Sequence, residues 1–166
     1  MTAQFSEVLK YRGETLSLCS YPLNVYWKSS GNPIELKSTS TACWRGYVGT
    51  WEIKGDRLYL VKFWGHRKGE SELAQVGLAE VFPGYAEGVF AHWFSGDLRC
   101  PQGKWLRYLG SRHDSQHERD QFISIRRGVV IGEREVLNGV AQEVDSLASG
   151  GMDDYVIPDF LKRKAD

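Results

Sequence analysis

The sequence has few prolines, few cysteines and no excess of either charge. Five prolines among 166 residues exclude a proline-rich, low-complexity chain. The three cysteines, Cys19, Cys43 and Cys100, are far apart and form no CxxC pair. We therefore expect reduced, buried thiols, without a disulfide framework or a cysteine metal site. Twenty-one basic residues balance 21 acidic ones, which argues against a nucleic-acid-binding protein, since such proteins carry excess Lys and Arg.

Long apolar segments are also missing. No run approaches the roughly 18 residues that a membrane span requires. The first thirteen residues have neither the basic start nor the apolar segment of a signal peptide. We therefore expect a soluble, cytoplasmic protein with no membrane partner. The length predicts one domain that buries its core without metals or cross-links.

Glycine and aromatic residues are abundant, with 18 Gly, 13% aromatics and six Trp. Spread between short apolar runs, they are typical of an all-β chain with tight turns. The clearest segment is 44–63, where apolar residues alternate on both sides of Lys54-Gly55-Asp56. This pattern predicts a β-hairpin whose second strand, apolar on both faces, is central in a sheet.

Similar runs predict about nine or ten short strands in all. The expected segments are 7–12, 15–19, 88–94, 98–100, 104–109, 122–126 and 129–135, while 73–82 fits a strand or a short helix. Consecutive hairpins favour an antiparallel meander that forms a sandwich or a barrel. Residues 1–136 are predicted to form this single β domain. Residues 137–166 are expected to form a short C-terminal helix or tail, docked or partly disordered.

The polar segment 28–42 is predicted to be an irregular loop of about fifteen residues, a length that often has a function. Trp44 and Arg45 follow this loop, and Trp64 stands at a hairpin end. Trp and Arg are enriched at binding hot spots. We expect about four Trp in the core and one or two at a surface, and we take Trp44, Arg45 and Trp64 as candidate partner-binding residues.

Acidic residues crowd the last third of the chain. The candidates for a partner-binding acidic patch are Glu133, Glu135, Asp153 and Asp154, with Glu143 and Asp145 nearby. Such a patch would suit a partner with a basic active site. The short basic clusters 66–68 and 126–127 are offset by nearby acids, and we interpret them as solvated turns.

Three histidines are candidates for chemistry. His113, Asp114, His117 and Glu118 lie within six residues, so a divalent-metal site or an acid–base pair is one interpretation. The surrounding segment is highly charged, and the alternative interpretation is a solvated loop. His92 interrupts an apolar run, where a core or interface histidine competes with a general base. No Ser-His-Asp order, phosphate-binding glycine loop or HExxH motif is present.

Gly49-Thr50-Trp51 resembles the Gly-x-Trp signature of the lipocalins, which are ligand-binding barrels. The likeness covers three residues, and two predicted strands precede it where a lipocalin has none. The other interpretation is that Trp51 is a core residue beside a glycine that makes room for it.

The segments WRGYVGTWEIKGDRLYL and WFSGDLRCPQG carry a wider likeness. They resemble a group of small bacterial β-rich proteins with a WRGY-x-x-TWEI-x-x-x-x-LYL core, over roughly residues 7–136. Small bacterial proteins of this kind are similar to the immunity proteins of polymorphic toxins. The resemblance implies a protein that binds and neutralises a cognate toxin.

Three functions are therefore expected. The first is a non-enzymatic cytosolic binding protein, most concretely an immunity protein, without cofactor or metal. The second is a small-molecule-binding, calycin-like β-barrel, and the third is a metal-assisted enzyme that uses His113 and His117. The first is favoured because no catalytic constellation is found while Trp and Arg are in surplus.

Overall fold

The computed structural model describes residues 4–31, 34–38, 40–69, 75–107 and 116–139. Most of these residues lie in one mixed sheet with two short helices, so the predicted all-β class is confirmed. No helix in these ranges is long and apolar enough to cross a membrane. The predicted helix or tail at 137–166 lies outside the described residues, apart from its first three positions.

Nine strands in the described ranges form the sheet, in agreement with the predicted nine or ten. They are β1 (Glu7–Tyr11), β2 (Glu14–Leu18), β3 (Tyr47–Lys54), β4 (Arg57–His66), β5 (Gln75–Val76), β6 (Val89–Phe90), β7 (Gly96–Arg107), β8 (Gln116–Arg126) and β9 (Val129–Leu137). Their order is β2-β1-β3-β4-β9-β8-β7, and β5 and β6 both pair with β4. The helices are α1 (Pro22–Ser30) and α2 (Leu78–Val81).

The β3–β4 hairpin confirms the prediction for residues 44–63. Its turn residues Gly55 and Asp56 both have positive φ, 54° and 62°, which matches the twist of the two strands they join. β4 pairs with β3, β5, β6 and β9, so it is the central strand that its two apolar faces predicted.

The strand order differs from an uninterrupted antiparallel meander because β1 pairs with β3 in parallel, with Leu9 opposite Trp51. Parallel neighbours require a crossover, and residues 19–46 with α1 supply it. α1 was not predicted from the sequence. Its last three residues, 28–30, are the start of the segment 28–42 that was expected to be a loop, so the irregular part begins only after Ser30.

Three further strand predictions are corrected. The expected strand 98–100 and residues 104–107 of the expected strand 104–109 belong to one strand, β7, whose register shifts between Gln102 and Trp105 without ending it. The expected strand 88–94 is reduced to β6, and segment 73–82 contains both alternatives, as β5 followed by α2.

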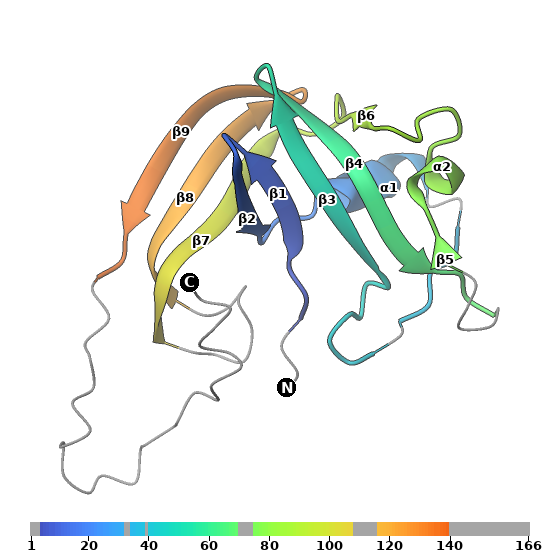
Figure 1. Ribbon diagram of the computed structural model, residues 1–166, viewed down its shortest axis with the longest axis horizontal. Coiled ribbons are helices and arrows are strands. Elements are labelled where there is room, and N and C mark those ends of the chain that lie inside the picture. The colour runs from blue at the N-terminus through green and yellow to red at the C-terminus, as the bar shows by residue number, and fades with distance from the viewer. Residues whose placement is uncertain (1–3, 32–33, 39, 70–74, 108–115, 140–166) are drawn as a thin grey trace, which may run out of the picture.

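The sheet bends into two wings that diverge below the top of the view in Figure 1. We call β1–β4 the packed wing and β7–β9 the open wing. They are joined through β4 and β9, which pair only at Arg57 and Val129. At the other side the Cys19 N–H donates to the Arg99 carbonyl at 2.9 Å, and β2 approaches β7. This contact does not close the sheet into a barrel, and the fold is consistent with an open sandwich.

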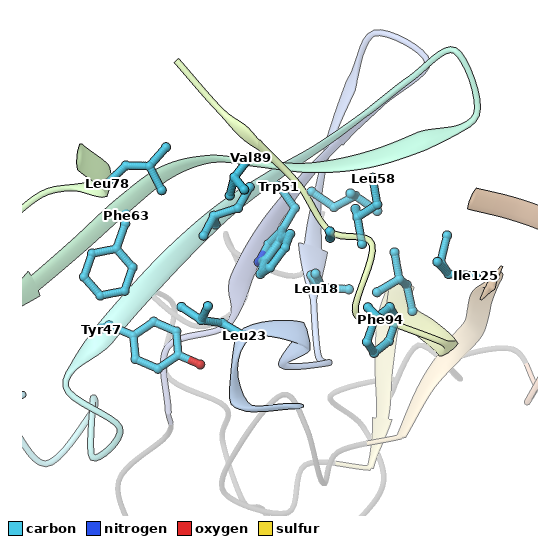
Figure 2. Packing of buried hydrophobic residues seen from close by; sticks show 14 of the residues in the cluster. Leu18, Leu23, Tyr47, Trp51, Leu58, Phe63, Leu78, Val89, Phe94 and Ile125 are labelled. Carbon is cyan, nitrogen blue, oxygen red and sulfur yellow. The ribbon is translucent and has the colours of Figure 1, made fainter. Parts of the chain in front are cut away.

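The core lies inside the bend. Figure 2 shows Trp51 near its centre, with Tyr47 and Phe63 toward one end and Phe94 and Ile125 toward the other. Tyr47 stacks on Phe63 with ring centroids 5.4 Å apart, and Trp27 of α1 meets Tyr47 edge-on at 5.1 Å. α1 therefore covers an end of the apolar interior of the packed wing.

Candidate functional site

The six tryptophans divide between the core and the surface. Trp51 is fully buried, Trp27 and Trp93 pack against the core, and Trp105 is half-buried. Trp44 is 65% exposed and Trp64 is 39% exposed. About four tryptophans were expected in the core and one or two at a surface; three lie in or against the core and two are exposed, and the exposed ones are those taken as binding candidates.

Trp64 borders a groove of about 440 Å³ on the β3–β4 ladder. The groove is lined by Val48 and Thr50 of β3, by residues 61–64 of β4, and by Leu78 of α2. Val48 and Trp64 are cross-strand partners, and the Trp64 ring meets the His66 ring edge-on at 4.8 Å. His66 is buried. The result is an open, mainly apolar recess with one cation, that of the exposed Lys62, at its rim.

The candidate acids lie in another place. Glu133 and Glu135 belong to β9, where every residue except Val130 is exposed. Glu133 Oε2 forms an ion pair with Arg12 Nη1 at 3.2 Å. Arg12 lies at the tip of the β1–β2 hairpin. Because β4 and β9 diverge after one pair of residues, the structure does not bring these acids together with Trp64 (Figure 1). Asp153 and Asp154 lie outside the described residues.

Arg45 is mostly buried, unlike its neighbour Trp44. Its Nε donates to Glu7 Oε1 at 3.0 Å and its Nη1 donates to the Phe5 carbonyl at 2.7 Å. The guanidinium also lies over the rings of Tyr21 and Tyr47, at 4.7 and 5.4 Å from their centroids. These contacts give Arg45 a structural role in joining the N-terminal strand to β3.

The partner of Arg45 is a buried carboxylate that the sequence analysis did not single out. Glu7 is only 1% exposed, and its Oε2 accepts hydrogen bonds from the Gly49 N–H and from Trp51 Nε1. Burial raises the pKa of Glu7 to about 7, against the lowering effects of Arg45, Trp51 and Gly49. The alternation in EVLKY, which places Glu7 on the face of Leu9 and Tyr11, was the signal that could have found it.

The Gly-x-Trp segment serves this same carboxylate. A Cβ on Gly49 would overlap Glu7 Oε2 and come within 3.0 Å of Trp51 Nε1, so only glycine leaves room for the acid. Trp51 is at the centre of the core. The interpretation of Trp51 as a core residue beside a space-giving glycine is therefore confirmed.

The histidine candidates do not converge on one site in the described residues. His117 is fully buried with its ring 6.2 Å from that of Trp105, whereas Glu118, the next residue of β8, points to the opposite face of the strand. His113 and Asp114 lie outside the described residues. The exposed ring of His92 lies near the rings of Phe90 and Trp93. Within the described ranges, no group of three or more His, Cys, Asp or Glu has metal-binding geometry.

The concave face of the open wing is polar where it extends beyond the core. On this face Gln102 Nε2 donates to Gln121 Oε1 at 2.7 Å, and Arg119 Nε donates to Gln102 Oε1 at 3.2 Å. The same face of β8 carries Ile123 and Ile125 in the core. The composition of the concave face thus changes from apolar to polar along β8.

The cysteines and the basic cluster 66–68 lie in packed or ion-paired surroundings. No disulfide joins the three cysteines, Cys43 and Cys100 are buried, and burial raises the pKa of the Cys100 thiol to about 12. Of the first basic cluster, His66 is buried and Arg67 pairs with Glu80 at 2.8 Å. That cluster is therefore not a continuous basic surface.

Comparisons with protein-family models, with curated proteins and with solved structures found no match for this chain. The assignment of function therefore depends on the surfaces described above. Among them, the groove beside Trp64 and the edge of β9 are exposed, while the Glu7–Arg45 pair is internal.

Proposed function

We propose that this chain is a non-enzymatic protein-binding module, most concretely an immunity protein that neutralises a toxin by occluding it. The observation that carries the proposal is the half-exposed indole of Trp64 beside an open apolar groove. Trp is the residue most enriched at binding hot spots, and such residues contribute most where a pocket excludes water around them. Large aromatic side chains seldom stay exposed beside an apolar recess without a partner.

The groove defines the chemistry of the contact. Its apolar walls, formed by Val48, Val61 and Leu78, accept an aliphatic or aromatic side chain of the partner. Lys62 at the rim supplies a cation for a neighbouring carboxylate of that partner. The acids Glu133 and Glu135, on the other wing, steer a partner whose remaining surface is basic.

The test begins with capture of the binding partner from the lysate of the protein's own host. Wild type, Trp64→Ala and Phe5→Ala are used as baits, and retained proteins are weighed by native mass spectrometry. Phe5 is an exposed aromatic residue outside the lining of the groove, so its variant is the matched control. We expect a stoichiometric partner with wild type and Phe5→Ala, and at least tenfold less of it with Trp64→Ala.

Neutralisation is then tested directly. The captured protein is expressed alone and together with each bait, and growth is measured. We expect growth arrest that wild type and Phe5→Ala relieve and that Trp64→Ala does not. A retained protein that is harmless when expressed, or the absence of any stoichiometric partner, contradicts the immunity function. Equal retention by all three baits contradicts the role of the groove.

A further inference from the structure

The outer edge of β9 has backbone groups that no described strand pairs. β9 is paired with β8 from Val129 to Leu137, yet its pairing with β4 consists of Arg57 and Val129. The Asn138 N–H donates to the Glu118 carbonyl at 2.8 Å, which fixes the direction of the ladder. By the alternation of an antiparallel pair, the N–H and C=O groups of Glu133, Glu135 and Leu137 point away from β8.

This edge is long and carries apolar side chains, although exposed edges are usually short, bulged or covered. Ile131 is 65% exposed and Leu137 is 76% exposed. The one irregularity, the register shift between Ser124 and Ile125 of β8, lies at the top of the strand beside the junction with β4. Below it, the run from Gly132 to Leu137 is regular and free of proline.

The side chains along the edge have an ordered pattern. Glu133 and Glu135 face the same side as their partners Ile123 and Gln121, and Leu137 opposite Arg119 follows them. Ile131 precedes them and is the extra residue of β9 at the register shift, which forms a β-bulge. From top to bottom, the edge therefore presents an apolar residue, two acids and another apolar residue at alternate positions.

From this pattern we infer that β9 accepts an added strand from a partner protein, with Lys or Arg facing Glu133 and Glu135 and apolar residues facing Ile131 and Leu137. The Arg12–Glu133 ion pair shows that a guanidinium is already accommodated on this face. Strand addition supplies main-chain hydrogen bonds for affinity and alternate side-chain positions for specificity. The inference rests on the proposed function in that it defines part of the protein partner.

A second copy of the chain fits this edge poorly. In a two-fold antiparallel pairing centred on Arg134, Glu133 of one copy would face Glu135 of the other. Centred on Glu133, that residue would face itself. Like charges directly opposite each other are destabilising, so the acids guard against self-association while they favour a basic strand.

The test uses a synthetic peptide, acetyl-Thr-Ile-Thr-Lys-Thr-Lys-Thr-Leu-Thr-amide, and an acidic version in which both Lys are Glu. Binding to the full-length protein is measured by fluorescence anisotropy, and the site is located by amide hydrogen exchange. We expect the basic peptide to bind more tightly and to slow exchange at Glu133, Glu135 and Leu137.

Charge reversal separates recognition from a structural effect. Glu135→Lys should weaken the basic peptide about tenfold and strengthen the acidic one, because an attraction across the strands becomes a repulsion. The control Glu87→Lys makes the same change of net charge at an exposed position of the loop before β6 and should alter neither affinity.

Other outcomes overturn the inference. Equal binding of both peptides, or protection away from β9, removes the strand-addition site. Self-association through β9 in the wild type points to a second copy. If the three amides are already protected in the free protein and neither peptide binds, residues 140–166 of the same chain occupy the edge. None of these results affects the growth assay with Trp64→Ala, so failure of the inference and failure of the proposed function are distinguishable.

Discussion

The packed wing and the open wing are built from similar strands but end differently. In the packed wing the inward faces of β3 and β4 are apolar along most of their length, and α1 closes the end beside Tyr47. On β8, in the open wing, the core stops at Ile123, and beyond it the inward positions of this strand are Gln121, Arg119 and His117. The packed wing is therefore held by a buried apolar core along most of its length. The open wing has a polar inner face beyond the core and an exposed edge.

This difference separates the two surfaces that we propose for binding. A strand with neighbours on both sides uses all its backbone N–H and C=O groups in hydrogen bonds within the sheet. Below Val130, β9 is paired with a described strand on one side only. In the proposed function the packed wing contributes through side chains, with Trp64 beside its groove, and in the further inference the open wing contributes through its backbone edge. The two proposals therefore place two recognition modes on separate surfaces of one sheet.

The largest expected effect distinguishes the two wings by stability. Trp51→Ala removes the central core residue and a donor to the buried Glu7, and should lower the free energy of unfolding by about 3–5 kcal/mol. Leu137→Ala on the open wing should change it by less than about 0.5 kcal/mol. Urea denaturation measures both. Comparable losses for the two variants would mean that β9 is as well packed as β3.

The second effect is a pH dependence located in the packed wing. The pKa of Glu7 is raised from its usual 4.5 to about 7, so the folded protein holds a proton there that the unfolded chain releases. The contribution of Glu7 to stability should therefore be fully present below about pH 4.5 and be lost, by up to roughly 3 kcal/mol, as the pH rises through 7. Denaturation across this range measures the slope.

Two variants separate Glu7 from the other titrating groups. Glu7→Gln should flatten the decline between pH 5 and 8, because the amide has no proton to release in that range. Glu87→Gln, at an exposed position, should leave it unchanged. A decline that persists in Glu7→Gln would assign the dependence to other groups.

A smaller effect concerns the groove. Trp64→Ala should cost about 1 kcal/mol of stability, since the indole is only partly buried against Val48 and His66. Partner binding should be affected far more than stability. Thermal unfolding beside the capture assay compares them. A loss of several kcal/mol would make Trp64 a core residue and explain reduced binding by unfolding.

The smallest effect is expected at the edge. Ile131→Lys replaces an exposed side chain at the bulge, so stability should change by less than about 0.5 kcal/mol. Affinity for the basic peptide should fall, because the introduced lysine repels the lysines of the peptide and a charged side chain on an edge strand opposes the addition of another strand. Unchanged peptide affinity would place the added strand elsewhere.

The hairpins could be predicted from the sequence, because each depends on one short segment with a turn in the middle. The β3–β4 hairpin follows from alternation around Gly55-Asp56, and the β8–β9 hairpin follows from Arg127-Gly128, both with positive φ. α1 was missed because it has no side-chain N-cap, no acid in its first turn, and only Pro22 and Leu23 buried. A turn was predicted at Gly103, where the structure instead has a register shift within the continuous strand β7.

Contacts between distant segments were beyond such patterns. Glu7 and Arg45 are 38 residues apart and meet because β1 joins β3 in parallel, which no local signal indicates. The free edge of β9 likewise depends on the divergence of the two wings, whereas Trp64 is exposed because it lies on the face of β4 opposite to the core-facing Phe63. Sequence therefore suggested suitable residue types at Trp64, Glu133 and Glu135, whereas their separation onto two surfaces required the structure.

Amide hydrogen exchange on the free protein tests the contrast between the wings most directly. We predict slow exchange along β4 from Leu58 to Leu60, where it has neighbours on both sides, and a period of two in β9. There, Gly132, Arg134 and Val136 should be protected by β8, while Glu133, Glu135 and Leu137 exchange rapidly. Uniform protection along β9, equal to that of β4, would contradict an open edge.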